Sequence, residues 1–208
     1  MEYLQTWEAM EGFVASGKVR GIGVSNFTQE NLQHLIGVRL DSASCNLRGS
    51  SCARGIHRLT LVSWVRQQAS KTVPAVNQVE LHPYLSQPSL VQYCEGCGIR
   101  VMGYSPLGGS SDRAPEAHGT TLLAHPTVNA IAEDVHKTPG QVLIRWALQR
   151  GVISIPKSSN PERLTQNFGT LDWELPEQAM EQLAGLESDF RWVESKLRCS
   201  CPGDCRTD

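Results

Sequence analysis

The sequence lacks any apolar stretch long enough to cross a membrane, and its first residues lack the charged start and apolar run of a signal peptide. We therefore expect a soluble, cytoplasmic protein with no membrane partner. The sequence also lacks an excess of basic residues, since its formal net charge is -2 and 19% of its residues are charged. Proteins dedicated to nucleic-acid binding are usually basic, so we expect no nucleic-acid partner.

One further absence bears on the fold. The sequence contains no G-x-G-x-x-G turn, the phosphate-binding motif of doubly wound dinucleotide-binding sheets. Short apolar runs nevertheless alternate with helical patterns, and they predict strands near residues 19–24, 75–80, 99–103 and 152–155. Alternating strands and helices imply parallel strands joined by right-handed crossovers. The predicted class is therefore α/β, with the strands arranged as in a (β/α)8 TIM barrel.

The helical patterns begin at side chains that cap helix N-termini. Thr138 precedes Pro139 and Asn160 precedes Pro161, and proline suits the first turn of a helix. Thr6 is the predicted cap of the first helix. The predicted helices span residues 6–18, 28–36, 89–97, 126–137, 138–150 and 176–186. The predicted buried stripes include Trp7, Met10, Phe13 and Val14 in the first helix, and Val142, Leu143, Trp146 and Ala147 in the fifth.

The turn after the last predicted strand, 152–155, carries a pattern typical of anion binding. Lys157 and Ser158 lie between this strand and the helix that Asn160 caps, where backbone N–H groups and the helix dipole attract anions. Arg163 follows on the first turn, and a guanidinium binds phosphate while also stacking on an aromatic ring. These groups suit the 2′-phosphate and adenine of NADPH. Taken alone, they equally fit solvated residues at an ordinary helix start.

Other polar side chains also follow predicted strands. In an α/β barrel the carboxyl ends of the strands form the catalytic face, and a phosphate site commonly follows the last two strands. The residues at these ends are Ser25, Asn26, Gln78, Tyr104, Ser105, Lys157 and Ser158.

Four stretches in order along the chain, 10–27, 77–83, 104–108 and 155–167, resemble the aldo-keto reductase family. The resemblance covers most of residues 4–36 and 73–192. It implies an NADP(H)-dependent oxidoreductase that reduces a small-molecule carbonyl to an alcohol. It also implies that this chain supplies strands five to eight of the family's barrel with their helices, which makes it a partial barrel.

The resemblance implies a role for each matching residue at the nicotinamide end of the cofactor. Ser25, Asn26 and Gln78 would hydrogen-bond the nicotinamide carboxamide, and Tyr104 would stack on one face of the ring.

At the other end, Ser105 and Leu107 would line the pyrophosphate path, where Gly109 replaces a residue that is commonly serine in the family. The resemblance further implies that Lys157, Ser158 and Arg163 contact the 2′-phosphate. Asn167 would contact the adenine edge. Gln166 would lie near the adenine, at a position where the family commonly has an acidic residue.

The family's proton-donating tyrosine has no counterpart, because no Asp is followed within a few residues by Tyr-x-Asn-Glu. The sequence therefore yields no catalytic residue, and we expect no activity from this chain alone. An alternative is a non-catalytic half barrel that binds nucleotide or a partner. Its open edge strands would favour self-association.

The sequence predicts one partial barrel domain over residues 1–198, with an irregular insertion at 37–71 and a cysteine-rich tail at 199–208. A lesser alternative is a metal-binding module built on Cys94, Cys97 and the tail. Zinc ribbons need two C-x2-C pairs and only one is present. Cys94 also falls on the apolar stripe of its helix, so no metal ligand is predicted.

Overall fold

The structure is a computed structural model that describes residues 2–37, 72–109 and 119–193. The predicted insertion beyond Gly37 and the predicted tail at 199–208 lie outside these residues. The described chain divides into two compact units, the first including residues 2–37, 72–78 and 88–102 and the second including 79–87, 103–109 and 119–193. No helix in the described ranges is long and apolar enough to span a bilayer.

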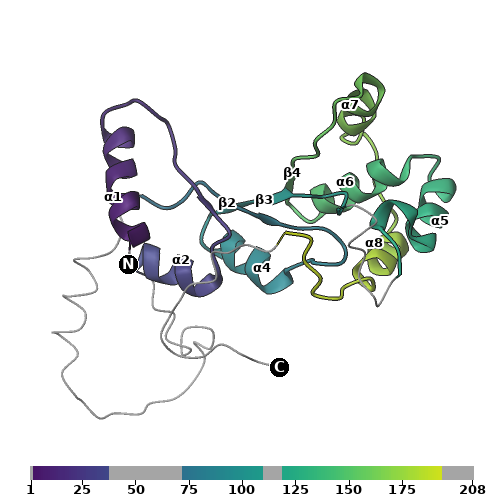
Figure 1. Ribbon diagram of the computed structural model, residues 1–208, viewed down its shortest axis with the longest axis horizontal. Coiled ribbons are helices and arrows are strands. Elements are labelled where there is room, and N and C mark those ends of the chain that lie inside the picture. Colours follow the sequence, from purple (N-terminus) through teal and green to yellow (C-terminus); the bar gives the residue numbers. More distant parts are fainter. Residues whose placement is uncertain (1, 38–71, 110–118, 194–208) are drawn as a thin grey trace, which may run out of the picture. The chain divides into compact units, whose positions relative to one another are not determined.

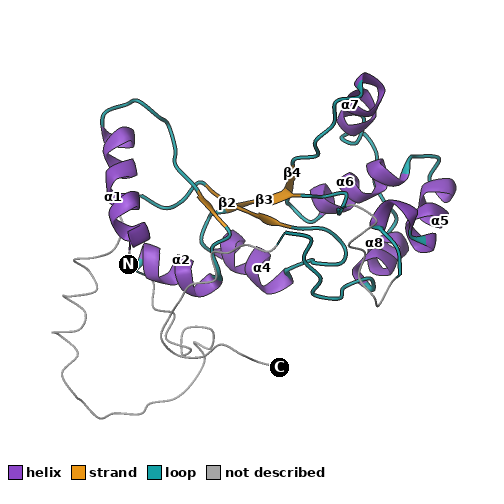
Figure 2. Ribbon diagram, viewed as in Figure 1, coloured by secondary structure: helices purple, strands orange, loops and turns teal. Residues whose placement is uncertain are grey.

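Strands and helices alternate along the chain (Figures 1 and 2). The strands are β1 (Val24–Ser25), β2 (Val76–Glu80), β3 (Arg100–Tyr104) and β4 (Ile153–Ser154). The described helices of the first unit are α1 (Glu2–Ala15), α2 (Gln29–Ile36) and α4 (Pro88–Gly96). The second unit contains the 3-10 turn η2 (Leu122–Ala124) and the helices α5 (Pro126–Asp134), α6 (Pro139–Gln149), α7 (Pro161–Phe168) and α8 (Glu177–Ala184).

Hydrogen bonds join the four strands in the order β1-β2-β3-β4. β1 pairs with β2 in parallel, with Val24 opposite Asn77 and Ser25 opposite Gln78, as the alternating pattern predicts. The prediction that the first strand begins at residue 19 was wrong, because only Val24–Ser25 is regular strand. Gly23 explains the difference. A Cβ there would lie 2.9 Å from the carbonyl oxygen of Val76, so the backbones approach too closely for a regular strand with side chains.

The core of the first unit forms around α1 and α2. Trp7 and Leu35 are buried together with Ile22, which precedes β1. The predicted cap at Thr6 was wrong, since α1 begins four residues earlier at Glu2. Phe13 was also predicted to be buried, but its side chain is 48% exposed. The helix therefore contributes a narrower buried stripe than its spacing predicts.

The core of the second unit is built on α6, which contacts α5, α7 and β4, while α5 also contacts α8. Thr138 caps α6 and forms a capping box with Gln141, and Pro139 occupies the first turn, as predicted. The predicted stripe of Val142, Leu143, Trp146 and Ala147 is buried. A capped helix with a buried stripe thus fixes the direction from which the chain enters β4.

Candidate functional site

Three of the predicted nicotinamide contacts lie together in the first unit. The hydroxyl of Ser25 donates to the carbonyl oxygen of Gln78 at 2.9 Å. The backbone N–H of Asn26 donates to the same oxygen at 2.8 Å. Asn26 has a φ of 58°, a left-handed conformation that asparagine tolerates better than most residues. The turn after β1 is therefore held against β2 by hydrogen bonds to one carbonyl group.

The side chain of Gln78 has a weak partner. Its Nε2 donates to the Sδ atom of Met102 at 3.1 Å. A thioether sulfur is a weak acceptor, so a stronger acceptor would take this hydrogen bond in preference. The amide of Gln78 is half-buried in the described structure and remains able to bind a polar ligand group.

Asn77 is a positioning residue that the sequence analysis missed. Its side chain is fully buried, and its Nδ2 donates to the carbonyl oxygen of Phe27 at 2.9 Å. The N–H of Phe27 donates back to Oδ1 at 3.4 Å. Asn77 thus fixes the turn that carries Ser25 and Asn26. The available signal was alternation along the strand, which places the side chain of Asn77 on the face opposite that of Gln78.

The residues that follow β3 form a tight turn in the second unit. The backbone of Ser105 has a φ of 50° and that of Gly108 a φ of 77°. The N–H of Gly108 donates to the carbonyl oxygen of Ser105 at 2.9 Å and closes the turn. The side chains of Tyr104 and Leu107 are half-buried beside it. These three predicted contacts, Tyr104, Ser105 and Leu107, therefore lie within one short turn.

The turn after β4 has the predicted helix cap. The Oδ1 of Asn160 accepts the N–H groups of Glu162 at 2.9 Å and of Arg163 at 3.1 Å. The hydroxyl of Ser158 accepts the N–H of Asn160 at 3.1 Å. The cap thus occupies N–H groups that an anion would otherwise contact. Recognition of an anion here depends chiefly on the side chains of Lys157 and Arg163.

Lys157 and Arg163 are both exposed. Within the described part of the chain, neither forms an ion pair with a carboxylate. Their charges are therefore available to an anionic ligand, and their exposure equally fits the solvated helix start that the sequence left open.

Gln166 and Asn167 lie one turn further along α7. The side chain of Gln141 donates to the carbonyl oxygen of Gln166 at 3.1 Å, and the hydroxyl of Thr170 donates to that of Asn167 at 2.8 Å. The backbone of this turn is thus fixed to neighbouring residues, whereas the Gln166 side chain is exposed.

The two cysteines of the C-x2-C pair are free thiols. Cys94 is buried in α4, as its place on the apolar stripe predicts, and Cys97 is partly exposed. Burial raises the pKa of the Cys94 thiol, which disfavours the thiolate that binds metals. Among the residues that the structure describes, no group of three or more His, Cys, Asp or Glu side chains could hold a metal ion.

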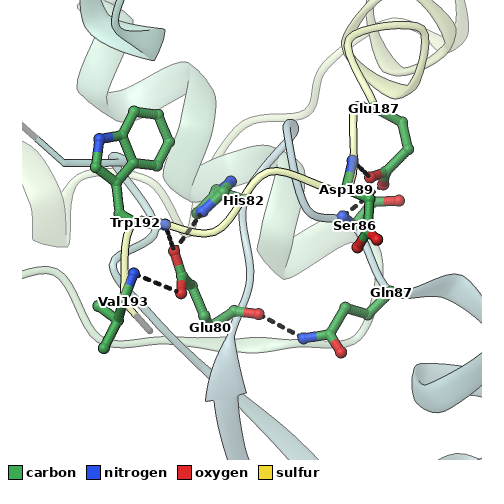
Figure 3. A network of polar contacts seen from close by, with 8 residues as sticks. All are labelled: Glu80, His82, Ser86, Gln87, Glu187, Asp189, Trp192 and Val193. Atoms are coloured by element: carbon green, nitrogen blue, oxygen red, sulfur yellow. Dashed lines mark hydrogen bonds and ion pairs between the residues drawn. The ribbon is translucent and has the colours of Figure 1, made fainter. Parts of the chain in front are cut away.

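A buried carboxylate in the second unit has no counterpart in the predicted site (Figure 3). The side chains of Glu80 and His82 are fully buried, and His82 Nε2 lies 3.0 Å from Glu80 Oε1. The backbone N–H of Trp192 donates to Oε1 at 2.7 Å, and that of Val193 donates to Oε2 at 3.1 Å. One carboxylate thus binds two consecutive backbone groups more than a hundred residues away in the sequence.

These contacts favour the ionised form of Glu80. Burial alone would raise the pKa of the carboxyl group, but the hydrogen bonds from His82, Trp192 and Val193 outweigh burial and lower it. The sequence did contain a signal for this network. Glu80 and His82 lie on either side of the apolar Leu81, and ionisable groups are seldom fully buried without a partner.

A second carboxylate fixes the other end of the same segment (Figure 3). Glu187 accepts the backbone N–H of Ser86 at 2.6 Å and that of Asp189 at 2.9 Å. Gln87 donates its side-chain N–H to the carbonyl oxygen of Glu80 at 2.6 Å. Residues 187–193 are therefore held against residues 80–87 at both ends.

A sheet in which helices alternate with strands, and in which polar side chains follow the strands, defines an α/β protein. The model of the aldo/keto reductase family matches residues 1–188. The chain belongs to this family, and the resemblance found in the sequence is confirmed.

Known relatives cover nearly the whole chain. It is 36% identical over 196 residues to pig aldo-keto reductase family 1 member A1, a match that covers 94% of this chain and 50% of the relative. It is 37% identical to the NAD(P)H-dependent D-xylose reductase I,II of Candida tropicalis, with 91% and 50% covered. An aldo-keto reductase from a deep-sea metagenome, MGS-M4, superimposes with a TM-score of 0.69 at 29% identity, covering 92% of this chain and 57% of that one. The chain therefore spans about half the length of the curated relatives it matches.

Glu80→Gln should lower the free energy of unfolding by about 1–3 kcal/mol at neutral pH, because a buried hydrogen-bonded charge is replaced by a neutral amide with one acceptor. The pKa of Glu80 in the folded state lies below its ordinary value of 4.5. The folded state therefore binds this proton more weakly than the unfolded state, so the stabilisation is complete above pH 4.5 and is lost as the pH falls through the folded-state pKa.

Urea unfolding of the wild type and Glu80→Gln at several pH values measures this difference. The gap between the two proteins should shrink as the pH falls below 4.5. Glu174→Gln is the matched control, because Glu174 is 80% exposed and its loss should change stability little. A gap that stays constant with pH would show that the charge of Glu80 contributes nothing.

Proposed function

We propose that this chain is the cofactor-binding half of an NADP(H)-dependent aldo-keto reductase, an oxidoreductase of small-molecule carbonyls. The observation that carries the proposal is the pair of exposed cations, Lys157 and Arg163, at the turn between β4 and α7, with no carboxylate partner among the described residues. The additional 2′-phosphate distinguishes NADP(H) from NAD(H), and it is a suitable ligand for a lysine and an arginine. Membership of the family supports a nicotinamide dinucleotide as the ligand.

The remaining cofactor contacts follow from the same proposal. Ser25, Asn26 and Gln78 would bind the carboxamide group, and the weakly bonded amide of Gln78 is suited to this role. Tyr104 would stack on the nicotinamide, and Ser105 and Leu107 would follow the pyrophosphate.

We further propose that the chain forms strands five to eight of a barrel and does not turn over substrate alone. Reduction of a carbonyl requires a proton for the developing alkoxide, and a positioned acid contributes roughly 10²–10⁴-fold to such a step. The sequence has no counterpart of the family's tyrosine acid. Aldehyde-dependent oxidation of NADPH is the assay that tests this part of the proposal.

Lys157→Ala and Arg163→Ala should each weaken NADPH binding by about 1.5–3 kcal/mol, which is roughly 10- to 100-fold in Kd. NADH binding should change little, since NADH lacks the 2′-phosphate. Fluorescence titration with both cofactors measures the effect.

Lys137→Ala is the matched control, because this lysine lies over the ring of Trp173 rather than at the start of α7. Equal wild-type affinity for NADPH and NADH, or an unchanged NADPH affinity in Lys157→Ala, would contradict the assignment.

A second candidate function is partner binding, and one surface of the second unit favours it. β4 is the last strand in the order of the described sheet, so its outer edge has no strand partner there. Large apolar side chains on β4, on α7 and just beyond each of them are exposed: Ile153 at 40%, Ile155 at 37%, Leu164 at 49%, Phe168 at 76% and Leu171 at 62%. An unpaired edge strand and exposed apolar side chains both favour association, and we propose a second copy of this chain as the occupant.

Phe168→Glu should therefore shift the purified chain toward the monomer, because a charge in an apolar interface loses its hydration on association. Sedimentation velocity over a range of concentrations measures the shift. Leu123→Glu is the control, since Leu123 is also exposed but lies in η2. A wild-type chain that stays monomeric at all concentrations would exclude this role.

A further inference from the structure

The most C-terminal part of the described chain carries an indole onto the turn that follows β3. Trp192 is 5% exposed. A Cβ atom at Gly108 would lie 3.0 Å from the Cη2 and Cζ3 atoms of the indole, and a Cβ at Gly109 would overlap its Cδ1 and Cγ atoms. The indole therefore rests directly on the backbone of Gly108 and Gly109. No side chain larger than hydrogen fits at residue 109 while Trp192 is in place.

The position of Trp192 is fixed through its backbone. Glu80 accepts the N–H groups of Trp192 and Val193, as described above. The carbonyl oxygen of Tyr84 also accepts the N–H groups of Ser188 at 3.3 Å and Phe190 at 3.1 Å. Four backbone N–H groups of residues 188–193 thus bind residues 80–87, and these hydrogen bonds fix the position of the Trp192 indole.

Three aromatic rings pack against the indole of Trp192. The ring of Tyr84 is stacked on it, with centroids 5.7 Å apart and planes at 17°. The rings of His82 and Phe190 meet it edge-on, each with a centroid distance of 5.0 Å. Offset and edge-on pairs of this kind are favourable, so the indole is held by packing as well as by its backbone.

We propose that Trp192 is a displaceable cover on the pyrophosphate path of the cofactor site. This inference rests on the proposed function, which assigns Ser105 and Leu107 to the pyrophosphate. A phosphate oxygen is no smaller than a methyl group, so a phosphate cannot lie on the Cβ side of Gly109 while the indole is there. A dinucleotide whose pyrophosphate lies on this side of the turn displaces Trp192, and the covered chain then binds it more weakly than the uncovered chain.

One buried nitrogen atom of His82 lowers the stability of the state in which Trp192 covers the turn. His82 Nδ1 is buried and has no hydrogen-bond partner in the described structure. A buried polar atom without a partner is destabilising, because it has lost its hydration without replacement. The indole of Trp192 packs edge-on against this imidazole, so release of the segment would remove one of the groups around it. Release would also cost Glu80 the N–H groups of Trp192 and Val193, which keeps the covered state favoured.

The test compares two nucleotides on the full chain. NADPH contains a pyrophosphate, whereas adenosine 2′-monophosphate contains only the 2′-phosphate and adenosine that Lys157 and Arg163 would bind. Trp192→Ala removes the cover, and Glu80→Gln weakens the hydrogen bonds to its backbone, since one acceptor oxygen is lost, while keeping the indole. Leu123→Ala is the control for an exposed apolar side chain. Isothermal titration gives both affinities for each protein, and circular dichroism establishes that each variant is folded.

Trp192→Ala and Glu80→Gln should bind NADPH about tenfold more tightly than the wild type, which corresponds to a cover in place in about nine molecules of ten. Their affinity for adenosine 2′-monophosphate should equal that of the wild type and of Leu123→Ala. If Trp192→Ala does not fold, Glu80→Gln carries the same prediction.

Two contrary outcomes are distinguishable. Unchanged or weaker NADPH binding by the folded variants, with adenosine 2′-monophosphate still bound, would overturn the cover and leave the proposed function intact. Failure of every protein to bind adenosine 2′-monophosphate would contradict the proposed function, and the cover with it.

Discussion

The buried carboxylate of Glu80 is the interaction on which the position of Trp192 and Val193 depends. An ionised group without water must be paired and hydrogen-bonded, and Glu80 meets this requirement with His82 and with two backbone N–H groups. Because those N–H groups belong to Trp192 and Val193, the hydrogen bonds that stabilise the buried carboxylate also fix the end of the described chain. A local electrostatic requirement near β2 thus determines where an indole rests beside the turn after β3.

Much of the fold could be predicted from the sequence because its signals are local. Asn160 and Thr138 cap helices through bonds to residues two or three positions away, and the stripe on α6 follows from helix geometry. The errors were also local. The residues around Thr6 predicted a helix that begins at residue 6, whereas the helix includes one more turn before it. The pattern from residue 19 predicted a long strand and did not reveal how closely Gly23 approaches Val76.

The candidate site was predictable only in part. The order of polar residues after successive strands identified Ser25, Asn26 and Gln78, which do lie together. The contact of Trp192 with Gly109 could not be predicted from the sequence. The two residues are far apart in the chain, and their contact depends on the path of the intervening helices. For the same reason, the sequence marks Glu80 and His82 as unusual but does not identify their partners.

The central functional claim is that this chain carries the cofactor half of a reductase site without the acid half. The most direct measurement is NADPH oxidation by an aromatic aldehyde, with protein purified free of other reductases. The account predicts that the chain binds NADPH but gives negligible turnover. Turnover of about 1 s⁻¹ or more, within the ordinary range of enzymes and abolished by Lys157→Ala, would contradict it.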